Sequence, residues 1–233
     1  MKINFLTLFP KYFNPFLEES IISKAIEKKL VAFEVIDWRN FSKDKHQKVD
    51  DTVFGGGQGM LLQIEPIDLA LNSLKNKGGY KILVSPQGIK FNQEIAKFLA
   101  TKEEITLISG RYEGFDERIT ELVDLELSIG DYVLTGGELP SMVIADTVVR
   151  LVPNVIKKES HMYESFEQQG LLDYPQFTQP RNYHSVLISK TLSVPEVLLN
   201  GNHKEIDNWR KEAQYQKTLK NRPDIIERIK NEK

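Results

Sequence analysis

Apolar residues occur along this chain in short runs that polar segments, glycines and prolines separate. Alternating apolar positions over 2–8 are typical of a strand, and the apolar residues after Asn14-Pro15 recur at helical spacing. Asparagine directly before proline favours a helix start with Asn14 as the N-cap. The pattern therefore predicts a strand over 2–8, a helix over 14–30, a strand over 33–38, a long polar loop over 39–63 and a helix over 66–75.

The centre of the chain repeats one unit three times: a short apolar strand, a loop containing glycine, and a helix. Strands that alternate with helices predict an α/β fold with a largely parallel sheet flanked by helices. Ligands of such sheets bind outside the carboxyl ends of the strands. The predicted strands cover 80–84, 105–108 and 125–129, and the loops after them cover 85–88, 109–114 and 129–137. The predicted helices cover 92–100, a segment from about Phe115, and 140–152.

The last of these loops lies in Leu127–Pro140, which reads LSIGDYVLTGGELP. Its middle, Tyr132–Leu134, is apolar and resembles a strand, with Gly130 before it and Gly136-Gly137 after it. Glycine weakens regular structure, so three glycines around a short strand indicate tight bends of the backbone. Such bends let a ligand approach the main chain closely. A turn without any ligand is the alternative that the local sequence leaves open.

Other residue patterns exclude several kinds of site. The glycines of Phe54–Met60 are not followed by Gly-Lys-Ser/Thr, so the mechanics of an ATP-binding phosphate loop are missing, and no loop reads G-x-G-x-x-G as in dinucleotide sites. Cysteine is absent, which excludes disulfides and thiolate nucleophiles. The histidines show no metal-ligand spacing, so the sequence predicts no metal site; they are His46, His161, His184 and His203.

The chain changes character after residue 153. Residues 154–170 are polar without periodicity and predict a linker, and residues 171–233 become charged and helical. We therefore expect a domain over 1–153, a linker over 154–170 and a small C-terminal helical domain over 171–233. The net charge of −2 argues against sequence-independent binding of nucleic acid. Since no membrane-length apolar run or signal peptide is recognisable, we expect a cytoplasmic enzyme or binding protein without membrane contact.

Several motifs occur together in one order along the chain: VDDTVFGGGQGM, SPQG, SGRYEGFDERI, SIGDYVLTGGELP, ESF, GLLDYPQFT, GNHKEIDNWR and RPD. This set resembles the bacterial tRNA (guanine-N1-)-methyltransferases of the knotted (SPOUT) superfamily. That family methylates the guanine immediately 3′ of the anticodon, which supports reading-frame maintenance. The resemblance covers nearly the whole chain, and GRYEG together with IGDYVLTGGELP is its most specific part.

The resemblance implies a deep trefoil knot in the C-terminal part of the sheet domain. It implies a homodimer with composite active sites, a C-terminal domain that helps to grip the anticodon stem-loop of tRNA, and Mg²⁺ as a further requirement. It also implies that S-adenosylmethionine binds the loops 85–88, 109–114 and 129–140. The residues expected to contact it are Pro86, Gly110, Tyr112, Glu113, Ile129, Gly130, Asp131, Tyr132, Val133, Leu134, Gly136, Gly137 and Pro140.

The chemistry of the acceptor defines the catalytic groups. Guanine N1 carries a proton at neutral pH, and its removal moves negative charge onto O6, so the site needs a base near N1 and donors near O6. Arg150 matches the family's catalytic arginine, and its guanidinium is suited to donate hydrogen bonds to O6. From the residue pattern alone, the alternative role of Arg150 is a surface ion pair. Glu164 and Asp173 are the candidate bases. Their alternatives are a solvated linker charge for Glu164 and a local turn contact for Asp173.

Two departures from the family pattern stand out. Glu164 replaces the family's usual aspartate before Ser-Phe, with one additional residue between Phe166 and Gly170, and the segment 182–193 is longer than in many relatives. We predict that Glu164 is the base and that Asp173 supports it. Two other functions remain open from the sequence: a knotted RNA methyltransferase with another target nucleotide, and a catalytically silent RNA-binding relative.

Overall fold

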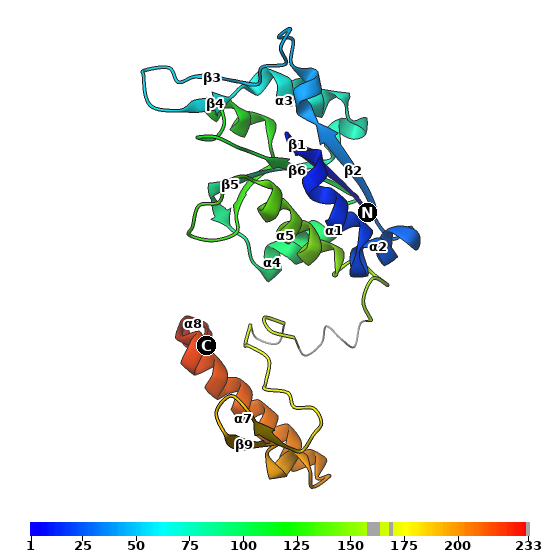
Figure 1. Cartoon of the computed structure of the whole chain (residues 1–233), viewed down its shortest axis with the longest axis vertical. Helices are drawn as coiled ribbons and strands as arrows, with labels where there is room; N and C mark the ends of the chain where they lie inside the picture. Colours follow the sequence, from blue (N-terminus) through cyan, green and yellow to red (C-terminus); the bar gives the residue numbers. More distant parts are fainter. Residues whose placement is uncertain (158–163, 168–169, 232–233) are drawn as a thin grey trace. The chain divides into compact units, whose positions relative to one another are not determined.

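The computed structural model describes residues 1–157, 164–167 and 170–231. Its contacts divide the chain into two compact units, Met1–Ile156 and Lys157–Lys233, which are considered separately (Figure 1). The sequence-based division into 1–153, 154–170 and 171–233 stays a prediction. Eight residues of its linker, 158–163 and 168–169, lie outside the described residues. No helix in the described ranges is long and apolar enough to cross a membrane.

The described part of the first unit contains a five-stranded parallel sheet in the order β2-β1-β6-β5-β7. The predicted α/β fold with a central parallel sheet is therefore confirmed. Buried strands carry apolar residues on both faces, and β6 illustrates this with five consecutive buried residues. The strands are β1 (Lys2–Thr7), β2 (Ala32–Asp37), β5 (Tyr80–Lys90), β6 (Glu104–Ser109) and β7 (Leu125–Ser128).

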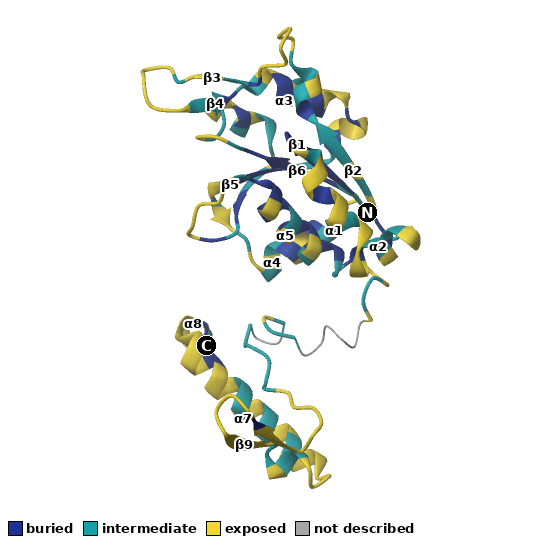
Figure 2. Ribbon diagram, viewed as in Figure 1, coloured by how far each residue is buried: buried dark blue, intermediate teal, exposed yellow. Residues whose placement is uncertain are grey.

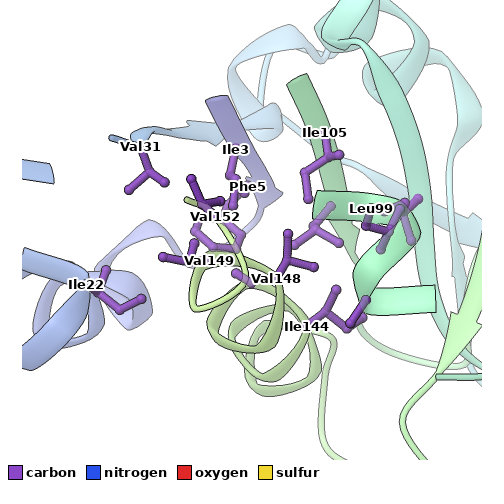
Figure 3. Close-up of a cluster of buried hydrophobic side chains, with 14 of the residues drawn as sticks. Ile3, Phe5, Ile22, Val31, Leu99, Ile105, Ile144, Val148, Val149 and Val152 are labelled. Atoms are coloured by element: carbon purple, nitrogen blue, oxygen red, sulfur yellow. The ribbon is translucent and has the colours of Figure 1, made fainter. Parts of the chain in front are cut away.

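Helices cover both faces of the sheet, and each face has its own apolar core. Successive strand residues point to opposite faces, so Leu107 packs into one core and Ile108 into the other. In the first core α5 contributes Ile144, Val148 and Val149 against the sheet (Figure 3). The helices on that face are α1 (Asn14–Glu18), α2 (Ser20–Glu27), α4 (Gln93–Ala100) and α5 (Glu138–Val149); the other face carries α3 (Ile64–Ser73).

The structure corrects the predicted helix over 14–30. The N-cap is Phe13, without a side-chain cap, and Asn14 is already helical. The helix is then interrupted, because Glu19 is extended and Ser20 has φ of 62°. The predicted helix start at Asn92 agrees with the structure to within one residue. Asn92 is the N-cap of α4, and its side chain accepts from the Ile95 N–H at 2.9 Å.

Three predicted elements in the centre of the chain also differ from the structure. Residues 85–88 lie inside β5 as an irregularity, because β5 regains its pairing with β7 at Ile89. The helix expected from Phe115 is a short 3₁₀ helix, Glu117–Leu122. Tyr132–Leu134 is not a strand: β7 ends at Ser128, and the segment after it has no strand partner in the described chain.

The polar loop predicted over 39–63 contains regular structure. A 3₁₀ turn, Trp38–Phe41, leads to an antiparallel hairpin of β3 (Asp50–Thr52) and β4 (Met60–Leu62). Phe54 in the connecting loop is 96% exposed. The remaining 3₁₀ segments of this unit are Pro10–Phe13 and Lys75–Gly78.

The second unit is built from a hairpin and two helices. Its elements are β8 (Asn182–Ser185), β9 (Lys190–Ser193), a 3₁₀ turn (Glu196–Leu198), α7 (His203–Asn221) and α8 (Pro223–Asn231). The hairpin accounts for the long segment 182–193 noted in the sequence. Among the described residues of this unit, the buried hydrophobic residues are Ile225 and Ile226, and most of α7 is exposed (Figure 2).

Candidate active site

A cavity of about 220 Å³ lies at the carboxyl ends of β5, β6 and β7. These three strands are neighbours in the sheet, so the segments that follow them meet at one edge. The walls come from Val84–Pro86, Gly110–Phe115 and Leu127–Gly137 (except Asp131), with Pro140 of α5. Residues of all three predicted glycine-bearing loops therefore border one cavity.

Almost all residues predicted to contact a cofactor lie on this cavity. Asp131 does not line it: its side chain is 89% exposed and pairs with Lys90 at 3.0 Å. The predicted residues that line it are Pro86, Gly110, Tyr112, Glu113, Ile129, Gly130, Tyr132, Val133, Leu134, Gly136, Gly137 and Pro140.

The apolar run Tyr132–Leu134 misled the strand prediction for a physical reason. Its side chains are substantially exposed, Val133 at 84%, yet all three line the cavity. Apolar residues that face a cavity give the same sequence signal as apolar residues that face a core. The structure therefore makes this run a cavity wall, and Gly130, with φ of 154°, allows the sharp departure from β7.

Arg111 holds the cavity loops together, and sequence reasoning missed it. Its guanidinium donates to the Thr135 carbonyl at 3.1 Å and pairs with Glu138 at 2.9 Å. It also lies over the rings of Phe9 and Tyr12, at 4.5 and 5.2 Å. One side chain thereby connects the loop after β6, the loop after β7 and the loop after β1.

Glu138 is a buried carboxylate at the first turn of α5. Its side chain is 1% exposed, pairs with Arg111, and accepts from the Thr7 hydroxyl at 2.8 Å. Burial disfavours the charge of Arg111, but the Tyr12 hydroxyl and the Glu138 carboxylate outweigh it, so the pKa of Arg111 is raised. The signal that could have found Glu138 is a glutamate at a helix start, where the dipole favours negative charge.

Glycine is required at two cavity positions by the protein itself. A Cβ on Gly136 would collide with the Arg111 side chain. A Cβ on Gly137 would lie 2.8 Å from the backbone of Ser109 and Gly110, and the Gly137 N–H donates to the Gly110 carbonyl at 2.9 Å. The loop after β7 therefore packs directly on the loop after β6.

Glu113 connects the cavity to the β3–β4 hairpin. It lines the cavity, and its N–H donates to the Met60 carbonyl at 3.3 Å. A Cβ on Gly59 would collide with the Glu113 side chain. The end of the glycine-rich motif, Gly59 and Met60, thus packs beside the cavity.

The candidate catalytic residues divide between the two units. Arg150 is the C-cap of α5 in the first unit, and its N–H donates to the Asp146 carbonyl at 3.2 Å. Glu164 and Asp173 belong to the second unit.

Hydrogen bonds join the described residues 164–167, which include Glu164, to residues 170–173, which include Asp173; these two stretches are here called the turn. The Asp173 N–H donates to the Ser165 hydroxyl at 2.9 Å, and the Phe166 N–H donates to the Leu171 carbonyl at 2.8 Å, which brings the two ends of the turn together. Both carboxylate oxygens of Asp173 are engaged locally. Oδ1 accepts from the Tyr174 N–H at 2.7 Å, and Oδ2 accepts from the Gln176 amide at 2.8 Å.

Metal ligands do not gather in the described ranges, where no group of three His, Cys, Asp or Glu side chains could hold an ion. The Mg²⁺ implied by the resemblance therefore has no ligand set among these residues. His161 lies outside the residues that the structure describes.

Comparison with known proteins finds one family and several similar relatives, all of them tRNA guanine methyltransferases by name. Residues 1–228 match the family described as tRNA (Guanine-1)-methyltransferase TrmD. The chain is 72% identical to a tRNA (guanine-N(1)-)-methyltransferase of Mycoplasmopsis agalactiae and 67% identical to one of Mycoplasmopsis synoviae, in both cases over 233 residues and the full length of both chains. It is 62% identical to that of Metamycoplasma arthritidis over 230 residues, which cover 99% of this chain and 97% of the relative. The chain belongs to the tRNA (guanine-1)-methyltransferase family.

Proposed function

We propose that this chain transfers a methyl group from S-adenosylmethionine to N1 of the guanine immediately 3′ of the tRNA anticodon, which supports reading-frame maintenance. The observation that carries the proposal is the cavity at the ends of β5, β6 and β7, in a chain that matches the methyltransferase family over residues 1–228. The cytoplasm, where tRNA is used, is the proposed location.

The cavity residues fit S-adenosylmethionine. Apolar side chains such as Leu134 and Pro140 can cover the faces of the adenine, and main-chain groups of the lining loops can hydrogen-bond its edge. Glu113 can accept from hydroxyl or ammonium groups. When bound, the cofactor supplies a methyl group on a positively charged sulfonium.

The acceptor must be activated by side chains of the protein. Glu164 takes the proton from guanine N1, and Arg150 donates to O6 as negative charge develops there. Asp173 supports this step by fixing the turn, since both of its oxygens are already bonded to Tyr174 and Gln176. Mg²⁺ has only the family resemblance behind it, and we assign it no step.

The proposed assembly is a homodimer whose active sites take residues from both chains. Supporting it, α5 packs beside the turn Pro10–Phe13, and this region exposes large apolar side chains. Leu139 and Val143 lie one helical turn apart on α5 and are 51% and 47% exposed, while Phe9 and Tyr12 are 41% and 48% exposed. Such a surface is typical of a protein interface.

A trefoil knot is proposed on the family resemblance, against the general rule that chains do not thread. The Gly137 N–H bonds to the Gly110 carbonyl and Arg111 bonds to the Thr135 carbonyl, so the two loops are in direct contact, which the proposed knot requires. The second unit is proposed to grip the anticodon stem-loop. Its residues 157–233 contain 13 Lys and Arg against 11 Asp and Glu, a net charge of +2.

The proposal is tested by incubating the protein with unmodified tRNA and isotopically labelled S-adenosylmethionine, followed by nucleoside analysis. The expected product is labelled N1-methylguanosine. Binding of tRNA without any labelled nucleoside would instead favour a silent RNA-binding relative. Label in a different nucleoside would contradict the proposed acceptor atom.

Shared active sites require a separate experiment. We expect heterodimers of an Arg150→Ala chain with a Glu164→Ala chain to regain part of the activity that either homodimer lacks. The regain arises because one of the two sites then has both side chains. Verified heterodimers that stay inactive would show that Arg150 and Glu164 of one site come from the same chain.

A further inference from the structure

The second unit contains a pocket of its own, of about 410 Å³. The segment Tyr174–Gln179 forms one wall and α7 forms the other, with Trp209 and Arg210 facing the hollow. The remaining lining residues are Arg181, Val194, Leu198, Leu199 and Ile206. The pocket therefore lies directly after Asp173 in the chain, outside the cavity of the first unit.

The walls combine aromatic rings with groups that form hydrogen bonds. The rings of Phe177 and Trp209 lie 6.2 Å apart, and the Arg210 guanidinium lies 5.0 Å from the centre of the Tyr174 ring. Gln176 and Gln179 add side-chain amides. Aspartate and glutamate are missing from the described lining, and arginine is present.

Packing alone does not account for this group of aromatic residues. Phe177 is 48% exposed and Trp209 is only half-buried, whereas the buried apolar residues described in this unit are the isoleucines of α8. An aromatic side chain that serves a core is normally buried. Here the rings border a hollow that is open to a ligand.

The chemistry of these walls matches an unpaired nucleobase. Single-stranded RNA is read by stacking bases on aromatic rings or on arginine planes and by hydrogen bonds to the base edges. The helix beside the pocket is net positive: α7 contains five Lys and Arg against three Asp and Glu, which favours a phosphate backbone next to it. An apolar peptide would not use the amides and guanidinium groups.

We propose that this pocket binds one unpaired nucleobase of the tRNA, stacked on Trp209. This inference rests on the proposed function, because it takes tRNA as the substrate. In this proposal the second unit recognises one individual base of the tRNA, in addition to attracting the RNA by its positive charge.

Tryptophan fluorescence tests the contact directly, because the sequence contains only Trp38 and Trp209. Trp38 is fully buried in the first unit, so it serves as an internal reference. Titration with unmodified tRNA should quench the Trp209 emission, and Trp209→Phe should remove that quenching. Unchanged Trp209 emission at a tRNA concentration that saturates methylation would overturn the inference while the proposed function stands.

An abasic scan identifies the base. In a series of anticodon stem-loop RNAs, each lacking one loop base, one RNA should bind about 5- to 150-fold more weakly, as loss of a stacked base predicts. Trp209→Ala should weaken binding of the intact RNA by a similar factor. The loss of affinity from Trp209→Ala and the loss from removing that base should not add. Fully additive losses at every position would overturn the inference.

Tyr215→Ala is the matched control, since Tyr215 is an aromatic residue of α7, 38% exposed, outside the pocket lining. It should bind the intact RNA like the wild type, and equal losses from Tyr215→Ala and Trp209→Ala would contradict a specific pocket. A change of oligomeric state in Trp209→Ala would make the pocket a protein interface and also overturn it. Absence of methyl transfer by the wild-type protein would reject the proposed function itself.

Discussion

The two units of this chain bury their side chains very differently. The first unit has apolar cores on both faces of its sheet, whereas the buried hydrophobic residues described in the second are two neighbouring isoleucines. Residues 1–156 carry 18 Lys and Arg against 22 Asp and Glu, a net charge of −4, while residues 157–233 carry +2. The exposed apolar residues of the second unit extend to the hairpin tip, where Leu187 is 93% exposed.

This difference separates two tasks. A cofactor cavity needs walls fixed by packing, and the first unit fixes them from both faces of the sheet. A surface that binds RNA needs exposed rings and positive charge, and the unit proposed to bind tRNA has both, with few buried apolar residues in its described part. The candidate base Glu164 nevertheless lies in the second unit, so the proposed mechanism uses both units.

The largest effect expected is the loss of chemistry in Glu164→Gln. A positioned general base contributes about 10² to 10⁴ in rate, or roughly 3 to 5 kcal/mol of barrier. Single-turnover methylation should fall by about that factor while cofactor and tRNA affinity remain. Asp173→Asn should lower the methylation rate less, because it disturbs the turn but leaves the Glu164 carboxylate present. If Asp173→Asn abolishes the chemistry and Glu164→Gln barely changes it, the two roles are reversed.

Loss of the Arg111–Glu138 ion pair should show how strongly the first unit is fixed. Arg111→Ala leaves a buried carboxylate without its cation, which typically costs about 3 to 5 kcal/mol of unfolding free energy. Calorimetry should also detect weaker binding of S-adenosylmethionine. Lys43→Ala is the control, because its ion pair with Glu65 is exposed and such pairs contribute about 0 to 1 kcal/mol. Equal effects of the two substitutions would refute a special role for Arg111.

Independent stability of the two units can be measured with the two tryptophans. Leu107→Ala should lower the unfolding free energy of the first unit by about 2 to 5 kcal/mol, because it leaves a cavity in a dense core. Denaturation followed by Trp38 emission should shift, and that followed by Trp209 should not. Ile226→Ala should shift only the denaturation curve followed by Trp209 emission. Joint shifts in both variants would mean that the units unfold as one.

The smallest effect expected is on the cavity loop. Gly136→Val should weaken cofactor binding by about 5- to 150-fold, since its side chain collides with Arg111 and overpacking of this kind costs about 1 to 3 kcal/mol. Gly136→Ala should weaken cofactor binding less. The loss should shrink in an Arg111→Ala background, where the space is free. Calorimetry showing unchanged affinity in Gly136→Val would count against this placement of the cofactor.

The sequence predicted the sheet well, because β1, β6 and the start of β5 are buried and strongly apolar. It failed at Tyr132–Leu134, since side chains lining a cavity resemble those of a buried strand. It also missed Arg111, whose partners Glu138 and Thr7 are distant in the chain. Only the fold brings Arg111, Glu138 and Thr7 together. The proposed roles of Glu164 and Arg150 rest on family resemblance, because local spacing gives no signal for them.

The central claim concerns one atom of one nucleotide, and mapping the product tests it most directly. A methyl group on guanine N1 blocks the pairing edge, so reverse transcriptase stops directly before the modified position. After treatment of unmodified tRNA with the protein and S-adenosylmethionine, we predict a new stop directly before the guanine 3′ of the anticodon. At the same single-turnover reaction time, Glu164→Gln should give a much weaker stop there. A stop at another nucleotide, or no stop with the wild-type protein, would contradict the account.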